Sequence, residues 1–224
     1  MPVMTTEAPH PLAAEAASSE PYLAGMRRLL VAVQELSMAK RLIDVQTIVR
    51  KAARELTGCD GATFVLRDGE RCHYADEDAI APLWKGLKFP LETCISGWAM
   101  LNKESAVIPD IYADPRIPHD AYRPTFVKSL VMVPVRRLDP IAAVGNYWAT
   151  SRQPTTEEVS LLQALADATS VAMENVRVHD ALEQQERDRD EHLRALDQET
   201  RELQDLASEV NSRIQELSRV GPLH

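Results

Sequence analysis

The cysteine at position 94 has the clearest potential for chemistry in this sequence. The segment that follows it, Ile95–Asn102, is expected to form a short helix, so the Cys94 thiol would lie at a helix N-terminus. The helix dipole stabilises a thiolate at such a position and makes the cysteine more nucleophilic. A redox reaction would also need a second thiol, for which Cys59 and Cys72 are the candidates. Buried cysteines are usually inert packing residues, and a core role for Cys94 is therefore the alternative.

The sequence carries few other signals of catalysis. It contains no glycine-rich phosphate loop, no Gly-x-Ser-x-Gly elbow, and no His-Glu-x-x-His or paired-cysteine metal motif. Among the six histidines, only His73 and His119 fall in segments expected to border a domain pocket. We therefore expect a protein without catalytic residues and without a metal site, and the sequence does not specify a cofactor.

Length, composition and charge restrict the class of protein further. A chain of 224 residues can form one ordinary domain with appended segments, and 45% hydrophobic residues suffice for a core. The net charge of −9 disfavours binding to nucleic acid. No apolar run approaches the roughly 18 residues of a membrane span. The N-terminus also lacks the basic start and apolar core of a signal peptide. We expect a cytoplasmic protein that binds neither nucleic acid nor membrane.

The N-terminal quarter of the chain divides into two segments. Residues 1–21 contain four prolines and many alanines and are expected to form a disordered leader. In residues 22–57, apolar side chains recur mainly at spacings of three and four, which is typical of an amphipathic helix. The prediction is one long helix or two helices in line, ended by Gly58, because glycine readily takes the left-handed conformation of a helix end.

Five segments have the pattern of β-strands. Asp68-Gly69 is a strong hairpin signal between two of them. Ile95–Asn102 is a short helix between strands, and a polar loop with three prolines follows residue 109, with one helical turn expected around residues 120–123. The predicted strands are Ala62–Arg67, Arg71–Ala75, Ala106–Ile108, Lys128–Arg136 and Ala142–Thr150.

The C-terminal third predicts one long helix. Thr155 can cap its N-terminus, carboxylates occupy its first turn, and no helix breaker follows before Gly221. Residues 176–220 are expected to form a coiled coil, because from Leu193 onward mainly apolar residues occupy the core positions of four consecutive heptads with charged flanks. Before Leu193 the seam is polar, with Glu186 and Arg189 at core positions, and a weakened section is expected there. We expect a parallel homodimer, and a short tail at residues 221–224. The predicted dimer seam consists of Leu193, Leu196, Leu203, Val210, Ile214 and Leu217.

The segment from Cys94 to Val135 has a distinctive order of elements. A helix that opens at Gly97 is followed by a short strand at residues 105–108, an Asp-Pro loop and a buried strand. This order resembles the GAF domain, a small-ligand sensing module of bacterial signalling proteins, which we place at residues 58–175. The resemblance implies an α+β fold, with a central antiparallel sheet flanked by helices and followed by the long coiled-coil helix.

The resemblance also implies where a ligand would bind. In GAF domains the ligand lies between the central sheet and the loop-rich layer after the short helix, which here is residues 94–124. Alternatively, the aromatic side chains of this region could pack the core, and the pocket could be empty. Cyclic nucleotides are disfavoured, because the Asn-Lys pair of GAF domains that bind them is missing after the last strand. The expected ligand-binding residues are Cys94, Trp98, Asp110, Tyr112, His119, Tyr122, Arg123, Lys128, Met132 and Trp148.

Three hypotheses for the function follow. The loop at residues 112–129 is similar to that of GAF domains in bacterial two-component sensor histidine kinases, although no kinase core is expected within the chain. The favoured hypothesis is a cytoplasmic, non-catalytic sensor that binds an unknown small ligand and signals to an output partner through a dimeric coiled coil. The second is a thiol redox enzyme or redox sensor that uses Cys94, although the catalytic cysteine of related methionine sulfoxide reductases corresponds to Ser96 here. The third is a ligand-free dimerisation adaptor.

Overall fold

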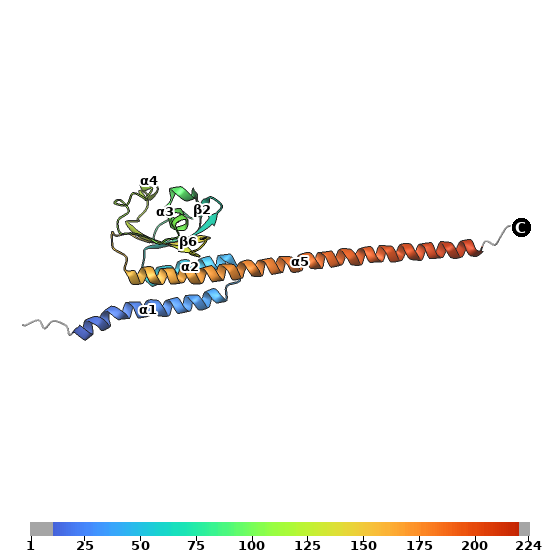
Figure 1. Cartoon of the computed structure of the whole chain (residues 1–224), viewed down its shortest axis with the longest axis horizontal. Coiled ribbons are helices and arrows are strands. Elements are labelled where there is room, and N and C mark those ends of the chain that lie inside the picture. Colours follow the sequence, from blue (N-terminus) through green and yellow to red (C-terminus); the bar gives the residue numbers. More distant parts are fainter. Residues whose placement is uncertain (1–10, 220–224) are drawn as a thin grey trace, which may run out of the picture. The chain divides into compact units, whose positions relative to one another are not determined.

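The computed structural model describes the backbone of residues 11–219 and the side chains of residues 22–216 (Figure 1). Contacts divide the chain into two units, one that ends at Val176 and one that starts at Arg177. The first unit contains all the strands, and the second consists of the later part of the last helix. No helix within residues 11–219 is both long and apolar enough to cross a membrane.

The first unit is built on one antiparallel sheet of six strands. Their order is β3-β2-β1-β6-β5-β4, and every neighbouring pair is antiparallel, as predicted for the central sheet. The predicted Ala106–Ile108 strand and Ile95–Asn102 helix have the bounds that the structure shows. The strands are β1 (Gly61–Asp68), β2 (Arg71–Ala79), β3 (Lys88–Pro90), β4 (Ala106–Ile108), β5 (Ser129–Val135) and β6 (Ala142–Trp148).

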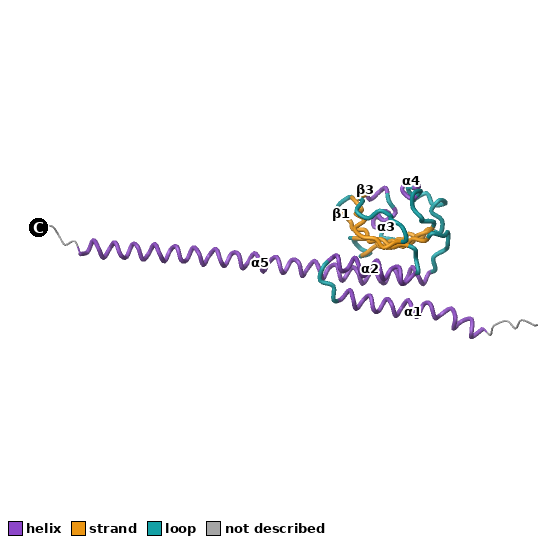
Figure 2. Tube along the Cα trace, turned by 180° about the vertical axis from the view of Figure 1, so that it is seen from behind, coloured by secondary structure: helices purple, strands orange, loops and turns teal. Residues whose placement is uncertain are grey.

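The two faces of the sheet carry different layers (Figure 2). One face packs against α2 (Leu42–Thr57) and the first part of α5 (Thr156–Arg219), with α1 (Pro11–Ser37) outside them. The other face is covered by α3 (Ile95–Asn102), the single turn α4 (His119–Tyr122) and long loops. Because successive side chains of a strand point to opposite faces, each face has its own buried cluster.

The N-terminal helices differ from the prediction in two respects. Residues 11–21 belong to α1 and are not a disordered leader, whereas residues 1–10 lie outside the described part of the chain. Pro11 lies in the first turn of α1, where proline is well tolerated, and the alanines that follow have the highest helix propensity, whereas Pro21 inside α1 disfavours the helix. The predicted 22–57 helix is neither single nor two helices in line. It turns back at residues 38–41, and α1 packs along α2, with an ion pair between Arg28 and Glu55.

The C-terminus of α2 and the N-terminus of α5 are formed as the sequence predicts. Gly58 follows α2 with a φ of 60° and donates its N–H to the Arg54 carbonyl. At the start of α5, the Glu158 N–H donates to the Thr155 hydroxyl (3.1 Å), and the Thr155 N–H donates to the Glu158 carboxylate (2.8 Å). This reciprocal pair is a capping box, which satisfies two backbone donors that the helix itself leaves free.

A buried asparagine joins α2 to the sheet. The Asn146 side-chain amide, on β6, donates to the Ala53 carbonyl (2.8 Å) and to the Thr57 hydroxyl (2.9 Å) in the last turn of α2. Both acceptors lie near the end of the helix, and the Ala53 carbonyl also accepts the Thr57 hydroxyl (3.0 Å). The contact fixes the position of α2 on one face of the sheet, which leaves the opposite face to the loops and α3.

Candidate functional site

A pocket of about 260 Å³ opens on the sheet face that carries α3 and α4. Its walls come from β2 and β3, from the loop that joins them, from the residues just before α3, and from α4. Most of the wall is aromatic or aliphatic, as in most small-molecule sites. The lining residues are Tyr74, Trp84, Phe89, Thr93, Cys94, Pro118, Asp120, Ala121 and Tyr122.

Trp84 is the centre of the aromatic wall. Its ring meets those of Tyr122, Tyr74 and Tyr147 edge to face, at centroid distances of 4.7, 5.5 and 5.6 Å. The indole N–H donates to the Ala121 carbonyl (3.3 Å), so Trp84 also connects the loop after β2 to α4. Edge-to-face contacts fix the orientations of the rings, and the wall is therefore ordered without a ligand.

The loop that carries Trp84 is held by the carboxylate of Glu77. This side chain accepts the backbone N–H groups of Leu83 (3.0 Å), Trp84 (2.9 Å) and Lys85 (2.8 Å). The neighbouring Asp76 is buried, and it accepts from the Lys85 ammonium (2.7 Å). These acidic residues at the end of β2 therefore position a loop that has no regular secondary structure of its own.

We predict that Glu77→Gln loosens this loop. An amide has one acceptor oxygen and directs an N–H₂ group at backbone donors, so unsatisfied groups should cost about 1–3 kcal/mol. The amides of Leu83, Trp84 and Lys85 should then exchange with solvent about 5- to 150-fold faster, since 1.4 kcal/mol corresponds to a factor of ten. Hydrogen exchange measured by NMR checks this. Glu70→Gln, in the exposed β1–β2 turn, is the control, and equally slow exchange in Glu77→Gln and in the unmodified protein would contradict the assigned role.

The polar part of the pocket wall lies at the start of α3. Cys94 precedes the helix, and its sulfur lies 3.3 Å from the Ser96 hydroxyl, which in turn contacts the Tyr74 hydroxyl (3.1 Å). A side-chain hydrogen bond from Cys72, together with Ser96 and the backbone N–H groups of residues 96 and 97, lowers the pKa of the Cys94 thiol. Burial raises the pKa of Tyr74 well above its ordinary value, so this phenol stays neutral.

The structure brings only part of the predicted ligand-binding set to this pocket. Cys94 and Tyr122 line it. Met132 is buried in the same core cluster without lining the pocket, and Arg123 forms an exposed ion pair with Asp120 (3.5 Å). Trp98 lies under the guanidinium of Arg116, 4.4 Å from its ring centroid.

Four other predicted residues contact one another or the backbone around the loop after β4. The Lys128 ammonium lies 5.0 Å from the Tyr112 ring centroid, and the Tyr112 and His119 rings are 5.8 Å apart. His119 Nε2 is 3.0 Å from the Ile111 carbonyl. Asp110 accepts the Tyr112 N–H (2.9 Å) and so shapes the turn. These contacts stabilise the loop outside the pocket.

The placement of Trp148 in the pocket was wrong. Trp148 belongs to the buried cluster on the helix face of the sheet, where its ring lies 4.8 Å from the Arg152 guanidinium. On β6 it shares a side with Val144 and Asn146, while Tyr147 points to the α3 face. An error of one position along a strand therefore assigns a side chain to the wrong face of the sheet.

The residues that form most of the aromatic wall are absent from the predicted ligand-binding set. Trp84 lies in a segment without a clear pattern, and Tyr74 and Phe89 lie on β2 and β3. Alternation along β2 was the available signal, because Cys72 and Tyr74 share the buried face. The return of the chain as β3 depends on tertiary contacts and has no comparable signal.

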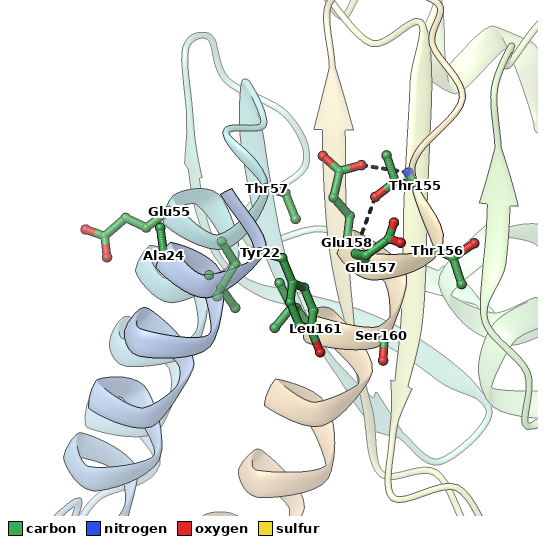
Figure 3. A pocket seen from close by; sticks show the side chains of 12 residues that line it. Tyr22, Ala24, Glu55, Thr57, Thr155, Thr156, Glu157, Glu158, Ser160 and Leu161 are labelled. Carbon is green, nitrogen blue, oxygen red and sulfur yellow. Dashed lines mark hydrogen bonds between the residues drawn. The ribbon is translucent and has the colours of Figure 1, made fainter. Parts of the chain in front are cut away.

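A larger hollow of about 1,080 Å³ lies among α1, the end of α2 and the first turns of α5 (Figure 3). Its polar groups include the capping box of Thr155 and Glu158. The Glu158 carboxylate also accepts a hydrogen bond from the Arg152 guanidinium (2.7 Å). These groups are thus occupied in maintaining the helix start. The aromatic pocket is the stronger candidate for a ligand site, because its wall is apolar and preformed.

Comparison with known proteins assigns the family. The family model of the GAF domain matches residues 39–174, more than half of the chain. The protein therefore belongs to the GAF family, whose members are regulatory or sensory modules that bind small ligands. A search of curated proteins gave no match.

Solved structures with very different roles share this fold. A GAF domain from a phosphoenolpyruvate-protein phosphotransferase of Coxiella burnetii is 15% identical, with a TM-score of 0.64 over 71% of this chain and 98% of that one. The free methionine-R-sulfoxide reductase of Neisseria meningitidis, solved with its substrate, is 16% identical (TM-score 0.61; 71% and 93% covered). The chromophore-binding domain of a bacteriophytochrome from R. palustris is 15% identical (TM-score 0.62; 72% and 64% covered). Identities this low establish the fold alone.

Proposed function

We propose that the protein is a cytoplasmic, non-catalytic sensor that binds a small molecule in the aromatic pocket. The observation that carries the proposal is a preformed apolar wall around Trp84, on the sheet face opposite the helices. A concave, mostly apolar wall with a few polar groups is the usual form of a small-molecule site.

The pocket wall indicates the chemical class of the ligand. Its volume of about 260 Å³ lies below the roughly 300–1,000 Å³ of sites for drug-sized molecules, which favours a compact ligand. Edges and faces of Trp84, Tyr74 and Phe89 favour stacking with a flat, largely uncharged ring. The Ser96 hydroxyl already contacts Tyr74 and Cys94, so few polar contacts would fix the orientation of the ligand.

We further propose that the sensor acts as a parallel homodimer through the C-terminal helix, in a bacterial signalling system of the two-component type. Within α5, the side chains of Leu193, Leu196, Leu203 and Val210 are between 45% and 61% exposed. The heptad pattern places these four residues on one seam together with Ile214 and Leu217. The side chain of Leu217 lies outside the described residues. A second copy would cover this seam and stabilise a helix that is marginal alone.

The ligand proposal can be tested by NMR through the three tryptophan indole N–H signals. Trp84 lies in the pocket wall, Trp98 beside Arg116, and Trp148 on the other face of the sheet. Small flat ring compounds such as indole should shift the Trp84 signal, and they should leave the Trp148 signal in place. Replacing each tryptophan by phenylalanine assigns the signals. Shifts at Trp148 without shifts at Trp84 would place binding elsewhere and contradict the proposal.

A further inference from the structure

Two of the three cysteines meet beneath the aromatic pocket. Cys72 lies on β2 and Cys94 immediately before α3, and both belong to the buried cluster on the α3 face of the sheet. Cys94 lines the pocket, whereas Cys72 lies behind the wall and is fully buried. A small molecule that enters the pocket can thus reach the Cys94 sulfur first.

Backbone pairing and side-chain contacts bring the two thiols together. Cys72 pairs with Phe89 in the ladder of β2 and β3, and the next residue, Pro90, has its carbonyl 3.6 Å from the Cys94 sulfur. The Ser96 hydroxyl lies 3.3 Å from the Cys94 sulfur, and both thiols belong to the same buried cluster. The two cysteines are therefore neighbours within one domain, and a reaction between them would not depend on a second chain.

The two thiols differ in acidity. Hydrogen bonds from Cys72, from Ser96 and from the first backbone N–H groups of α3 stabilise the Cys94 thiolate and lower the pKa of that thiol. The same contact with Cys94, together with burial, raises the pKa of Cys72. A thiolate is the nucleophilic form of cysteine, so Cys94 is suited to attack an oxidant. Cys72 stays protonated and is suited to react afterwards with the oxidised Cys94.

We propose that Cys72 and Cys94 form a dithiol centre that a small hydroperoxide oxidises to an intramolecular disulfide. The Cys94 thiolate attacks one peroxide oxygen, the O–O bond breaks, and the leaving hydroxide takes a proton to become water, which leaves a sulfenic acid on Cys94. The Cys72 sulfur then attacks the Cys94 sulfur, the S–O bond breaks, and the departing hydroxide takes the Cys72 proton as a second water. Two thiols are oxidised, and one hydrogen peroxide is reduced to two waters. This activity is independent of ligand sensing by the pocket.

Cys59 provides a matched control. It is also buried, but it lies in the cluster on the helix face of the sheet, where its thiol donates to the Gly61 carbonyl (3.1 Å). Burial raises the pKa of Cys59. The sheet separates this thiol from the other two, so it should neither react first nor join them.

Peptide mapping of the full chain after treatment with hydrogen peroxide tests the proposal. Trypsin places the three cysteines in separate peptides, at residues 55–67, 72–85 and 89–103. Without reductant, peptides 72–85 and 89–103 should be joined, and the joined mass should be two hydrogen atoms below their sum. Cys59→Ser should give the same joined peptide. Cys72→Ser should lose it and instead give a sulfenic acid on Cys94 that dimedone traps, and Cys94→Ser should lose both products.

The unmodified protein alone can overturn the inference, whatever the stability of the variants. After complete consumption of one equivalent of peroxide, recovery of peptides 72–85 and 89–103 without a link between them would contradict it. A link that contains the peptide with Cys59 would also contradict it. Formation of the disulfide in protein that binds no small ring compound would leave this inference standing while the ligand proposal fails.

Discussion

The double substitution Leu203→Asp with Val210→Asp should convert the proposed dimer into a monomer. Both residues lie on the exposed apolar seam of α5, and their side chains are 61% and 50% exposed within one chain. A dimer would lose four apolar side chains from its interface, which at about 1.5 kcal/mol each removes roughly 6 kcal/mol of binding free energy. The dissociation constant should then rise about 10⁴-fold.

Light scattering coupled to size-exclusion chromatography measures this change against the chain mass of 25.0 kDa. The control is Gln198→Asp with Ser212→Asp, which adds the same charge to the outer side of the heptads and should remain dimeric. Circular dichroism should show the sheet domain folded in both proteins. A double mutant that still has twice the chain mass would show that another surface forms the dimer.

Gly97→Ala should destabilise the fold strongly, although it adds only one methyl group. A Cβ atom built at Gly97 lies 1.8 Å from the Leu91 carbonyl oxygen, which belongs to the backbone and cannot rotate away. The short helix α3 would have to move off the turn at residues 91–93, and the start of α3 carries Cys94 and Ser96. We expect a loss of about 3 kcal/mol and a fall in Tm of about 6 to 12 °C.

Thermal unfolding followed by circular dichroism checks this prediction. Asn102→Ala changes an exposed residue of the same helix, whose side chain only bonds back to the Trp98 carbonyl, and its Tm should change little. If Gly97→Ala melts within a degree or two of the parent, the close contact between α3 and Leu91 is not a constraint on the fold.

Much of the fold could be predicted because local patterns and tertiary structure agree. The short helix α3, the strand β4 and the cap of α5 at Thr155 follow directly from periodicity and capping residues. The turn between α1 and α2 could not be located. The segment from residue 38 to 41 is Met-Ala-Lys-Arg, which contains no glycine or proline, so only packing of α1 against α2 reveals the break.

The site was harder to predict than the fold, because the pocket depends on tertiary placement. Cys94 and Tyr122 could be placed because the resemblance to the GAF domain puts the ligand against the loop-rich layer that contains them. Trp84 could not, because the loop that carries it is ordered by three hydrogen bonds to Glu77 and by no local pattern. Trp148 fell on the opposite face, since strand parity has to be known to the residue.

Native mass spectrometry of freshly purified protein shows whether the aromatic pocket holds a small molecule. We expect the unmodified protein to carry a bound small molecule in addition to the mass of its polypeptide. Ala121→Phe, which fills the pocket, should lose this mass, while Ala113→Phe, on an exposed loop position, should keep it. An unmodified protein with the bare polypeptide mass, or equal retention by Ala121→Phe, would contradict the account.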